Sequence, residues 1–489
     1  MFPGSKISEI ASKYPDRTAI IFKDQTMTFS ELEKTSSTLA AYLREEGVKK
    51  GDNAAIFLPN CPEFAIAYLA LAKLGAVVVL IDARSKATEL KEIARDAGFN
   101  LIICHETNEK HARKIQDIAR ILTTESIRKI IPEGKPFPSG IVLREDDEAL
   151  ILYTSGSTGR PKGVTLTFGN LGQSPSVMGK LWSSYLDVTG VALPMSHIAG
   201  LIYLTEIIDR GSTMVIFDQI SPQTLLESVE KYKITSFWSA PPIFQLILEY
   251  PHRKRYDATS LKFVAMMGMT VPLTLMQDFR REFPHVEVLT GLGLTETSPF
   301  ILACRLGHPE TKLGSLGRPV PRVQVRIVDG DGGEVPQGLV GELITRGPHV
   351  MKGYYNQPEE TAKRIHDGWF YTGDMGYFDE DGYFWHLGRK DDLVIIGGLN
   401  VYPAEVENVL KQVPQISEAA VYGISDGMRG EILKASVVLK PGEYISLTEV
   451  MRFCREKLTN FKVPKQIEIL NHLPKGHVGK VDKKLVAKE

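Results

Sequence analysis

Short apolar runs alternate with amphipathic helical segments along most of this chain, and this alternation constrains the fold more than any other feature. The runs AAIFLP, AVVVLI, LIIC and ALILY lie between residues 54 and 153, with helical patterns such as TELKEIARDAG between them. A second series, STMVIF, TSFW, LKFVAM and VEVLT, lies between residues 212 and 290. Buried strands separated by helices are typical of parallel sheets covered on both faces. We therefore expect an α/β protein with two doubly wound sheets.

The segment from Ser30 to Glu46 shows the helical pattern most clearly. Ser30 and Glu33 have the spacing of a capping box, and Gly47 follows the last helical residue. One face of the expected helix carries three leucines: Leu32, Leu39 and Leu43. This pattern predicts an amphipathic helix that begins at the capping box.

The stretch from Phe64 to Ile81 is long and apolar enough to resemble a membrane span. Lys73 and Gly75 divide it into a helix-like half and a β-branched half. A buried helix followed by a buried strand fits this division better than a span does.

The hydrophobic pattern of the sequence changes near residue 314, after which valine and isoleucine alternate with polar residues before the turn GDGG. This pattern predicts a small antiparallel β subdomain from about residue 314 to 389. A compact α+β pattern follows the charged residues 390–392. We expect an N-terminal domain at 1–389, a hinge at 390–392, and a small mobile C-terminal domain at 393–489.

The composition narrows the class of protein. The chain has 489 residues, and 58 Lys and Arg nearly balance 59 Asp and Glu. This balance removes the simplest electrostatic reason to expect a nucleic-acid or anionic-membrane partner. The four cysteines are scattered without metal-ligand spacing, and no signal peptide or membrane anchor is apparent. We expect a cytoplasmic protein, and homodimer formation is left open.

The segment YTSGSTGRPKG, residues 153–163, directly follows an expected strand. Its glycines and hydroxyl groups could surround phosphate oxygens, with Lys162 adding a positive charge. It is not a Walker loop, because Pro161 precedes the lysine and Gly163 follows it. Taken alone, such a loop is as readily a linker as a phosphate site.

This string resembles the phosphate-loop signature of the adenylate-forming superfamily, which includes acyl-CoA synthetases, peptide-synthetase adenylation domains and luciferases. Four further motifs resemble those of the same superfamily and follow in its order: GLGLTET at 291–297, YTGD at 371–374, GRKDD at 388–392 and PKGHVGK at 474–480. The chain is thereby similar to AMP-forming acyl-CoA synthetases of the fatty-acid or aryl-acid CoA ligase type. The resemblance implies ATP, Mg²⁺ and coenzyme A as co-substrates and cofactors.

The resemblance assigns roles residue by residue. Glu296 would help to hold Mg²⁺ and Thr295 would hydrogen-bond the phosphates, while Asp374 and Arg389 would bind the ribose. Lys480 would bridge the substrate carboxylate and the α-phosphate, which makes it the main catalytic residue with Thr295 and Glu296. The other implied nucleotide-binding residues are Thr154, Ser155, Gly156, Ser157, Thr158, Gly159, Lys162, Gly268, Met269, Gly291 and Leu292. Without the motifs, Glu296, Asp374, Arg389 and Lys480 would be ordinary surface residues.

The resemblance also implies two half-reactions separated by a domain rotation. The small domain would turn about Asp391, withdraw Lys480 and admit a thiol. Gly397 and Gly398 would line the channel for coenzyme A, where the absence of side chains permits close approach.

The sequence departs from the family pattern at several positions. Leu292 stands where an aromatic residue often stacks on adenine. Met266, Met267 and Met269 replace small residues, and such methionines are either core or part of an acyl or adenine pocket. Gly476 and Lys483 differ from frequent family residues.

A few positions indicate the class of acid that would be the substrate. His197 in PMSHIAGL stands where amino-acid-activating relatives carry an aspartate, and this local segment has no carboxylate. Amino acids are therefore disfavoured, although a purely structural histidine remains an alternative. The expected acyl pocket consists of His197, Trp238, Met267 and Gly293. An apolar or aromatic carboxylic acid is the expected substrate.

The acceptor is expected to arrive as a separate molecule, and coenzyme A is the simplest. Two alternatives remain: a stand-alone ligase that delivers the acyl group to a carrier protein or an amine, and a nucleotide-binding regulator without turnover.

Overall fold

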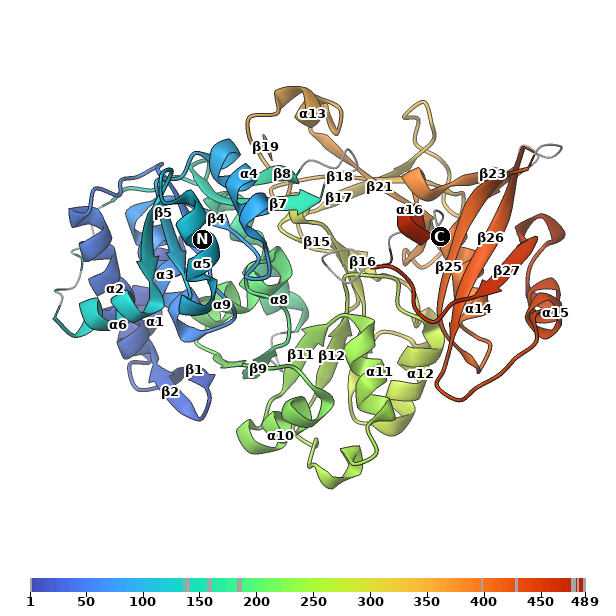
Figure 1. The fold of residues 1–489 in the computed structure, drawn as a ribbon, viewed down its shortest axis with the longest axis horizontal. Helices are drawn as coiled ribbons and strands as arrows, with labels where there is room; N and C mark the ends of the chain where they lie inside the picture. The colour runs from blue at the N-terminus through green and yellow to red at the C-terminus, as the bar shows by residue number, and fades with distance from the viewer. Residues whose placement is uncertain are drawn as a thin grey trace.

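The computed structural model describes residues 2–133, 135, 137, 141–155, 161–182, 187–396, 399–426, 430–475, 481 and 483–486. Within these residues, two seven-stranded sheets form the larger part of the molecule, and smaller sheets follow along the chain (Figure 1). The prediction of an α/β protein with two large sheets is confirmed.

The first sheet, which we call the amino-terminal sheet, runs in the order β19-β8-β7-β4-β3-β5-β6. Its strands are β3 (Asn53–Phe57), β4 (Val77–Leu80), β5 (Leu101–Cys104), β6 (Arg120–Thr123), β7 (Glu148–Ser155), β8 (Pro161–Thr167) and β19 (Gly353–Tyr354). β7, β4, β3, β5 and β6 pair in parallel, whereas β8 and β19 add antiparallel pairs at one edge. The apolar runs of the sequence form the parallel centre, because both faces of these strands are covered.

The second sheet, which we call the central sheet, runs in the order β13-β12-β11-β9-β10-β1-β2. Its strands are β1 (Thr18–Phe22), β2 (Gln25–Thr28), β9 (Val188–Val191), β10 (Thr213–Ile216), β11 (Ser236–Ser239), β12 (Phe263–Met266) and β13 (Glu287–Leu289). The sequence pattern did not indicate β1 and β2, which cross from the start of the chain to the edge of this sheet. There Ile20 lies opposite Met214 in a parallel pair.

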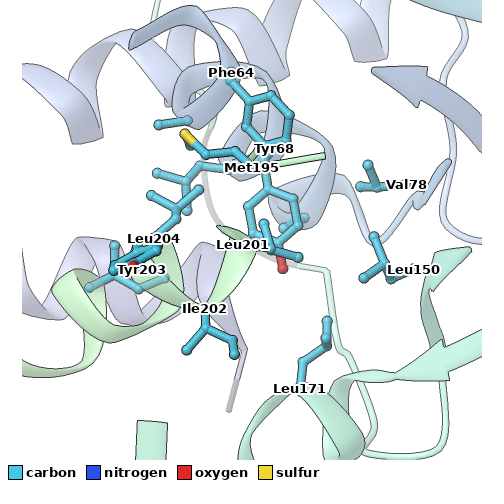
Figure 2. Close-up of a cluster of buried hydrophobic side chains, with 14 of the residues drawn as sticks. Phe64, Tyr68, Val78, Leu150, Leu171, Met195, Leu201, Ile202, Tyr203 and Leu204 are labelled. Atoms are coloured by element: carbon cyan, nitrogen blue, oxygen red, sulfur yellow. The ribbon is translucent and has the colours of Figure 1, made fainter. Parts of the chain in front are cut away.

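Helices cover these sheets and carry much of the core. They are α1 (Pro3–Lys13), α2 (Phe29–Glu45), α3 (Pro62–Leu74), α4 (Ala87–Ala97), α5 (Glu109–Ala112), α6 (Thr124–Glu133), α7 (Phe168–Leu171), α8 (Gln173–Leu181), α9 (Ile198–Arg210), α10 (Pro222–Tyr232), α11 (Pro241–Glu249) and α12 (Leu273–Glu282). Figure 2 shows Phe64 and Tyr68 of α3 facing side chains of α9 such as Leu201, with Leu150 of β7 beside them. These residues belong to one buried cluster, which joins the two sheets.

The segment that resembled a membrane span folds as α3 followed by β4, as predicted. α3 ends at Leu74, and Gly75 then takes a left-handed conformation with φ of 65°. Within the residues described, no helix is both long and apolar enough to cross a bilayer.

The predicted start of α2 was wrong by two residues. Thr28 caps the helix, with its side chain accepting from the backbone N–H of Glu31, and Glu31 completes the capping box. Glu33 instead pairs with Lys73 of α3 at 2.8 Å. The buried lysine needs a carboxylate partner, and this long-range demand takes Glu33 away from the local cap.

A five-stranded antiparallel sheet confirms the predicted β subdomain. Its strands are β17 (Gln324–Val328), β18 (Gly341–Arg346), β20 (Ile365–His366), β21 (Trp369–Phe378) and β22 (Phe384–Arg389). A three-stranded sheet links it to the rest through β14 (Gly291–Gly293), β15 (Phe300–Ala303) and β16 (Arg318–Pro319). Figure 1 shows these strands between the amino-terminal sheet and the C-terminal elements.

The last part of the chain forms a separate hydrophobic cluster of its own. Its elements are β23 (Val394–Ile396), β24 (Leu399–Val401), α14 (Pro403–Leu410), β25 (Ile416–Asp426), β26 (Gly430–Leu439), α15 (Leu447–Lys457), β27 (Gln466–Ile469) and α16 (Lys483–Val486). Val406, Leu410 and Val413 are buried in this cluster, and Val409 packs against it partly buried. The division into domains at residues 389 and 393 remains a prediction.

Candidate active site

The predicted phosphate loop joins two strands of a β-hairpin. β7 and β8 are antiparallel, so that Thr154 lies opposite Lys162. The backbone of Ser155 ends β7, while Gly156, Ser157, Thr158 and Gly159 lie outside the described residues. The hairpin places the two ends of the loop side by side, which is the geometry that a phosphate cradle needs.

Lys162 extends from β8 to a short helix, α13 (Pro358–Ala362). Its Nζ lies 2.5 Å from Glu360 Oε2 and 5.3 Å from the centre of the Tyr354 ring. The side chain of Lys162 is 13% exposed. The cation is thus held in place by a carboxylate and by the face of an aromatic ring.

Tyr354 connects this cation to the predicted magnesium ligand. Its hydroxyl donates to Glu296 Oε1 at 3.0 Å, and its ring faces Lys162. Burial, together with the neighbouring Glu296 charge, raises the pKa of Tyr354 well above its usual range. Tyr354 therefore remains a hydrogen-bond donor at any physiological pH.

Glu296 lies in a single 3₁₀ turn, Thr295–Thr297, and both Glu296 and Thr295 are half-buried. Among the residues described, no group of three or more His, Cys, Asp or Glu side chains could hold a metal ion. One half-buried carboxylate near the predicted phosphate loop nevertheless suits Mg²⁺, which keeps several waters and binds phosphate oxygens directly. The residues present therefore fit the ion.

Asp374 and Arg389 lie opposite each other on β21 and β22. Asp374 Oδ2 accepts from Arg389 Nη1 at 3.2 Å, and Oδ1 accepts from His386 Nε2 at 3.1 Å. Burial works to raise the pKa of Asp374, but His386 and Arg389 outweigh it and hold the pKa below its ordinary value. A carboxylate has about four acceptor positions, so the two donors leave acceptor capacity on this ion, whose side chain is 5% exposed.

Sequence reasoning missed His386 as part of this site. It belongs to β22 and reaches Asp374 across a hairpin with a register shift between Met375 and Gly376. No simple spacing rule would have found a contact that depends on this irregularity.

The glycines of the second nucleotide motif make room for the chain itself. A Cβ on Gly291 would lie 2.8 Å from the Leu302 carbonyl oxygen and 3.3 Å from Met267 Cε. A Cβ on Gly293 would lie 2.3 Å from the Pro299 carbonyl oxygen. The structure therefore brings Met267 beside Gly291, and both glycines permit close packing of backbone.

The methionines near this motif divide between core and edge. Met266 is fully buried in the cluster under α12, so the core interpretation holds for this residue. Met267 and Met269 are half-buried, and Gly268 is exposed with φ of +90°. Leu292 packs beside a small apolar cluster that includes Leu302.

The expected acyl pocket has two different parts. Trp238 is 1% exposed and lies in an aromatic cluster, with ring centres 5.4 Å from Trp182 and 5.0 Å from Tyr203. The indole N–H of Trp238 has no hydrogen-bond partner among the described residues. His197, by contrast, is partly exposed and lies just before α9.

A carboxylate lies beside His197, contrary to what the local sequence suggested. Asp82, which follows β4, places Oδ2 2.9 Å from His197 Nε2. Both carboxylate oxygens also bind Arg84. The local motif lacked an acid because the acid comes from another sheet. Since Asp82 is already paired, it does not restore a site for a substrate amine.

Both ends of the predicted hinge, residues 390–392, take part in ion pairs. Lys390 Nζ is 2.7 Å from the buried Glu342, whose other oxygen accepts from the backbone N–H of Gly373. Lys483 Nζ lies 2.7 Å from Glu407 and 3.9 Å from Asp392. Asp391 is exposed between them. The predicted residues Gly397, Gly398, Gly476 and Lys480 lie outside the described residues.

Comparison with known proteins places this geometry in a family. Residues 7–355 match the AMP-binding enzyme family, and residues 405–480 match the AMP-binding enzyme C-terminal domain. The chain is 33% identical to the long-chain-fatty-acid–CoA ligase of Bacillus subtilis (strain 168), over 99% of this chain and 94% of that ligase. It is 34% identical to a feruloyl-CoA synthase of Amycolatopsis sp., over 96% and 94% of the two chains.

Solved structures agree with the sequence relatives. The o-succinylbenzoate CoA synthetase of Bacillus subtilis, in complex with its acyl-adenylate intermediate, matches with a TM-score of 0.90 and 31% identity, over 98% of this chain and 97% of that chain. The same synthetase with ATP and a magnesium ion matches with a TM-score of 0.88 and 32% identity, over 97% and 98% of the two chains. The chain therefore belongs to the family of AMP-binding enzymes.

Proposed function

We propose that this chain joins an apolar or aromatic carboxylic acid to coenzyme A in two steps, with ATP as the energy source and an acyl adenylate as the intermediate. It is an AMP-forming acid–thiol ligase. The relatives named above are CoA ligases and synthetases, and one of them has been solved with an acyl adenylate bound. AMP and pyrophosphate are the other products.

The observation that carries this proposal is the contact of two motifs through Tyr354. This residue lies against Lys162 of the phosphate loop and hydrogen-bonds Glu296 of the second nucleotide motif. Tyr354 thereby contacts a cation at the face of its ring and, at its hydroxyl, a carboxylate that can bind Mg²⁺. This is the arrangement that a triphosphate with its metal requires.

In the first step, a carboxylate oxygen of the acid forms a bond to the α-phosphorus of ATP, and the bond from that phosphorus to the bridging oxygen of pyrophosphate breaks. Lys162, Thr295 and the hydroxyl-rich loop would hold the phosphates, and Lys480 would neutralise charge between the two anions. Asp374 and Arg389 would fix the ribose. Mg²⁺, when bound by Glu296, would neutralise charge on the phosphate oxygens.

In the second step, the sulfur of coenzyme A bonds to the acyl carbon and the bond from this carbon to AMP breaks, with the thiol proton passing to solvent. A rotation about Asp391 would move Lys480 out of the active site and bring the channel at Gly397 and Gly398 to the acyl adenylate. The ion pairs of Lys390 with Glu342 and of Lys483 with Glu407 support this proposal. Lys390, the residue before Asp391, is attached to Glu342, whereas Asp392, the residue after it, lies 3.9 Å from Lys483.

The class of acid is inferred from the residues expected around the acyl group. His197 is the polar member, and Trp238, Met267 and Gly293 offer apolar surface or space. The paired state of Asp82 supports an acid without an amine. A cytoplasmic location and a role in fatty-acid metabolism complete the proposal, and the four buried free thiols are compatible with a reducing compartment.

The experiment is a pyrophosphate-release assay with ATP, Mg²⁺ and a panel of fatty, cyclic and aryl acids, with and without coenzyme A. Lys480→Ala is compared with Lys457→Ala, which removes an exposed lysine of α15 in the same part of the chain. We expect one class of acid to give acid-dependent release, coenzyme A to raise turnover, and only Lys480→Ala to lose adenylation, while acid binding remains close to normal.

Other results would point elsewhere. Release that coenzyme A leaves unchanged would favour a carrier protein or an amine as acceptor. ATP binding without release on any acid would favour a nucleotide-binding regulator and contradict the proposal.

A further inference from the structure

His197 is held by contacts that come from a different sheet. Its Nε2 lies 2.9 Å from Asp82 Oδ2, although 115 residues separate the two in the sequence. The preceding loop is fixed as well, because Asn60 accepts from the backbone N–H of Met195 at 2.7 Å and donates to the Leu193 carbonyl at 2.9 Å. Asn60 and Asp82 follow β3 and β4 of the amino-terminal sheet, whereas His197 follows β9 of the central sheet. The histidine thus lies at the junction of both sheets.

Asp82 is held as an anion by several donors. The backbone N–H and Nε of Arg84 both donate to Oδ1 at 2.9 Å, and Nη2 of Arg84 donates to Oδ2 at 2.6 Å. Burial opposes ionisation, but Arg84 and His197 outweigh it and hold the pKa of Asp82 well below its usual range. Because an ionised carboxylate can only accept hydrogen bonds, the proton between Asp82 and His197 must reside on Nε2.

This assignment fixes what the other ring nitrogen can do. With hydrogen on Nε2, Nδ1 carries a lone pair in the neutral ring and a second N–H in the imidazolium. None of the residues that the structure describes hydrogen-bonds to Nδ1. The His197 side chain is 36% exposed, so the ring is open to a further group. A carboxylate at Nδ1 would require the imidazolium form, and the Asp82 charge would then balance the added positive charge.

We propose that Asp82 is a positioning residue for adenylation, which keeps Nε2–H of His197 directed at its own carboxylate and so fixes the ring orientation in which the imidazolium Nδ1–H donates to the substrate carboxylate. This inference rests on the proposed function, in which His197 borders the acyl site. Asp82 itself does not touch the substrate. Its effect therefore passes entirely through the imidazole.

The test compares Asp82→Asn, His197→Ala and the double variant in the acid-dependent pyrophosphate assay. Asparagine keeps the size of the side chain, but its amide can donate to Nε2 as well as accept from it, so the tautomer is no longer fixed. We expect Asp82→Asn to lower kcat/KM for the acid by roughly 10- to 100-fold, while KM for ATP stays within about twofold. The double variant should be no worse than His197→Ala alone.

The matched control is Asp147→Asn. Asp147 is 23% exposed against 22% for Asp82, and it also accepts from a cation, Lys50, and from a backbone N–H three residues away. It lies outside the proposed site. This variant should leave both kinetic constants for the acid unchanged, which separates loss of an aspartate from loss of this aspartate.

A spectroscopic readout is independent of turnover. In ¹⁵N-histidine-labelled protein, the His197 resonance is identified by its absence in His197→Ala. The wild type should show a protonated Nε2, and Asp82→Asn should show a mixture or a shift toward protonated Nδ1. A lone pair on Nε2 in the wild type, or equal losses from Asp82→Asn in both His197 backgrounds, would overturn the inference. If no acid gives release in the wild type, the proposed function fails, whereas the spectrum still decides the tautomer.

Discussion

Replacing Tyr354 with phenylalanine removes a single hydroxyl group from the proposed magnesium site. The ring stays under Lys162, so the cation–aromatic contact at 5.3 Å is kept. What is lost is the 3.0 Å hydrogen bond to Glu296 Oε1. The variant therefore asks whether this bond orients the carboxylate for Mg²⁺.

The expected magnitude follows from the geometry. A hydrogen bond to a charged group contributes about 1.5–3 kcal/mol, and the half-buried position of Glu296 favours the lower value. About 1.4 kcal/mol corresponds to a factor of roughly ten in an equilibrium constant. We expect the Mg²⁺ concentration at half-maximal adenylation to rise about tenfold, with kcat at saturating Mg²⁺ largely kept.

The assay is the magnesium titration of acid-dependent pyrophosphate release at saturating ATP. Tyr355→Phe is the control, because the neighbouring hydroxyl accepts from Asn53 and lies outside the proposed site. That variant should lose a little stability, about 1 kcal/mol, without a change in the titration. An unchanged or lower magnesium requirement in Tyr354→Phe would refute the reasoning, since Glu296 would then bind the ion without this support.

Two further predictions concern buried carboxylates. Asp374→Asn should raise KM for ATP by roughly 10- to 100-fold, because charge-assisted bonds to the ribose are lost. The control Asp379→Asn lies in the same hairpin and should affect only stability, since Asp379 binds Lys312 and Trp385. Equal KM values in the two variants would contradict the ribose assignment. Burial raises the pKa of Glu206 to about 8, so the folded chain binds more protons than the unfolded chain between about pH 4.5 and 8, and the free energy of unfolding should fall as pH rises through this window. Glu206→Gln should remove this slope in thermal denaturation measured at several pH values, and a slope that persists would assign it to another group.

The strand runs and the alternation of the β subdomain could be read from the sequence because each reflects burial on a regular period. The runs in β3, β4 and β5 are apolar because both faces of the sheet are covered. β1 and β2 escaped detection because nothing local reveals that Ile20 pairs with Met214 nearly two hundred residues later. Topology of that kind is decided by tertiary packing rather than by propensity.

The site residues likewise divide into those that local sequence identifies and those that only tertiary contacts reveal. Glu296, Asp374 and Arg389 were identified through motifs that are contiguous in the sequence, and the structure brings the last two into contact. Asp82 and Tyr354 were missed because each contacts a site residue that is far away in the sequence. The capping box at Ser30 was misplaced for a similar reason, since Glu33 pairs with Lys73 instead of the helix end.

The most direct test of the central claim follows the oxygen atoms of the acid. An accepted acid labelled with ¹⁸O in both carboxylate positions is incubated with ATP, Mg²⁺ and coenzyme A, and the products are examined by mass spectrometry. Attack of the carboxylate on the α-phosphorus, followed by thiol attack on the acyl carbon, predicts one ¹⁸O in each AMP and one in each thioester. Label in inorganic phosphate, with ADP as the other product, or AMP without label, would contradict the acyl-adenylate account.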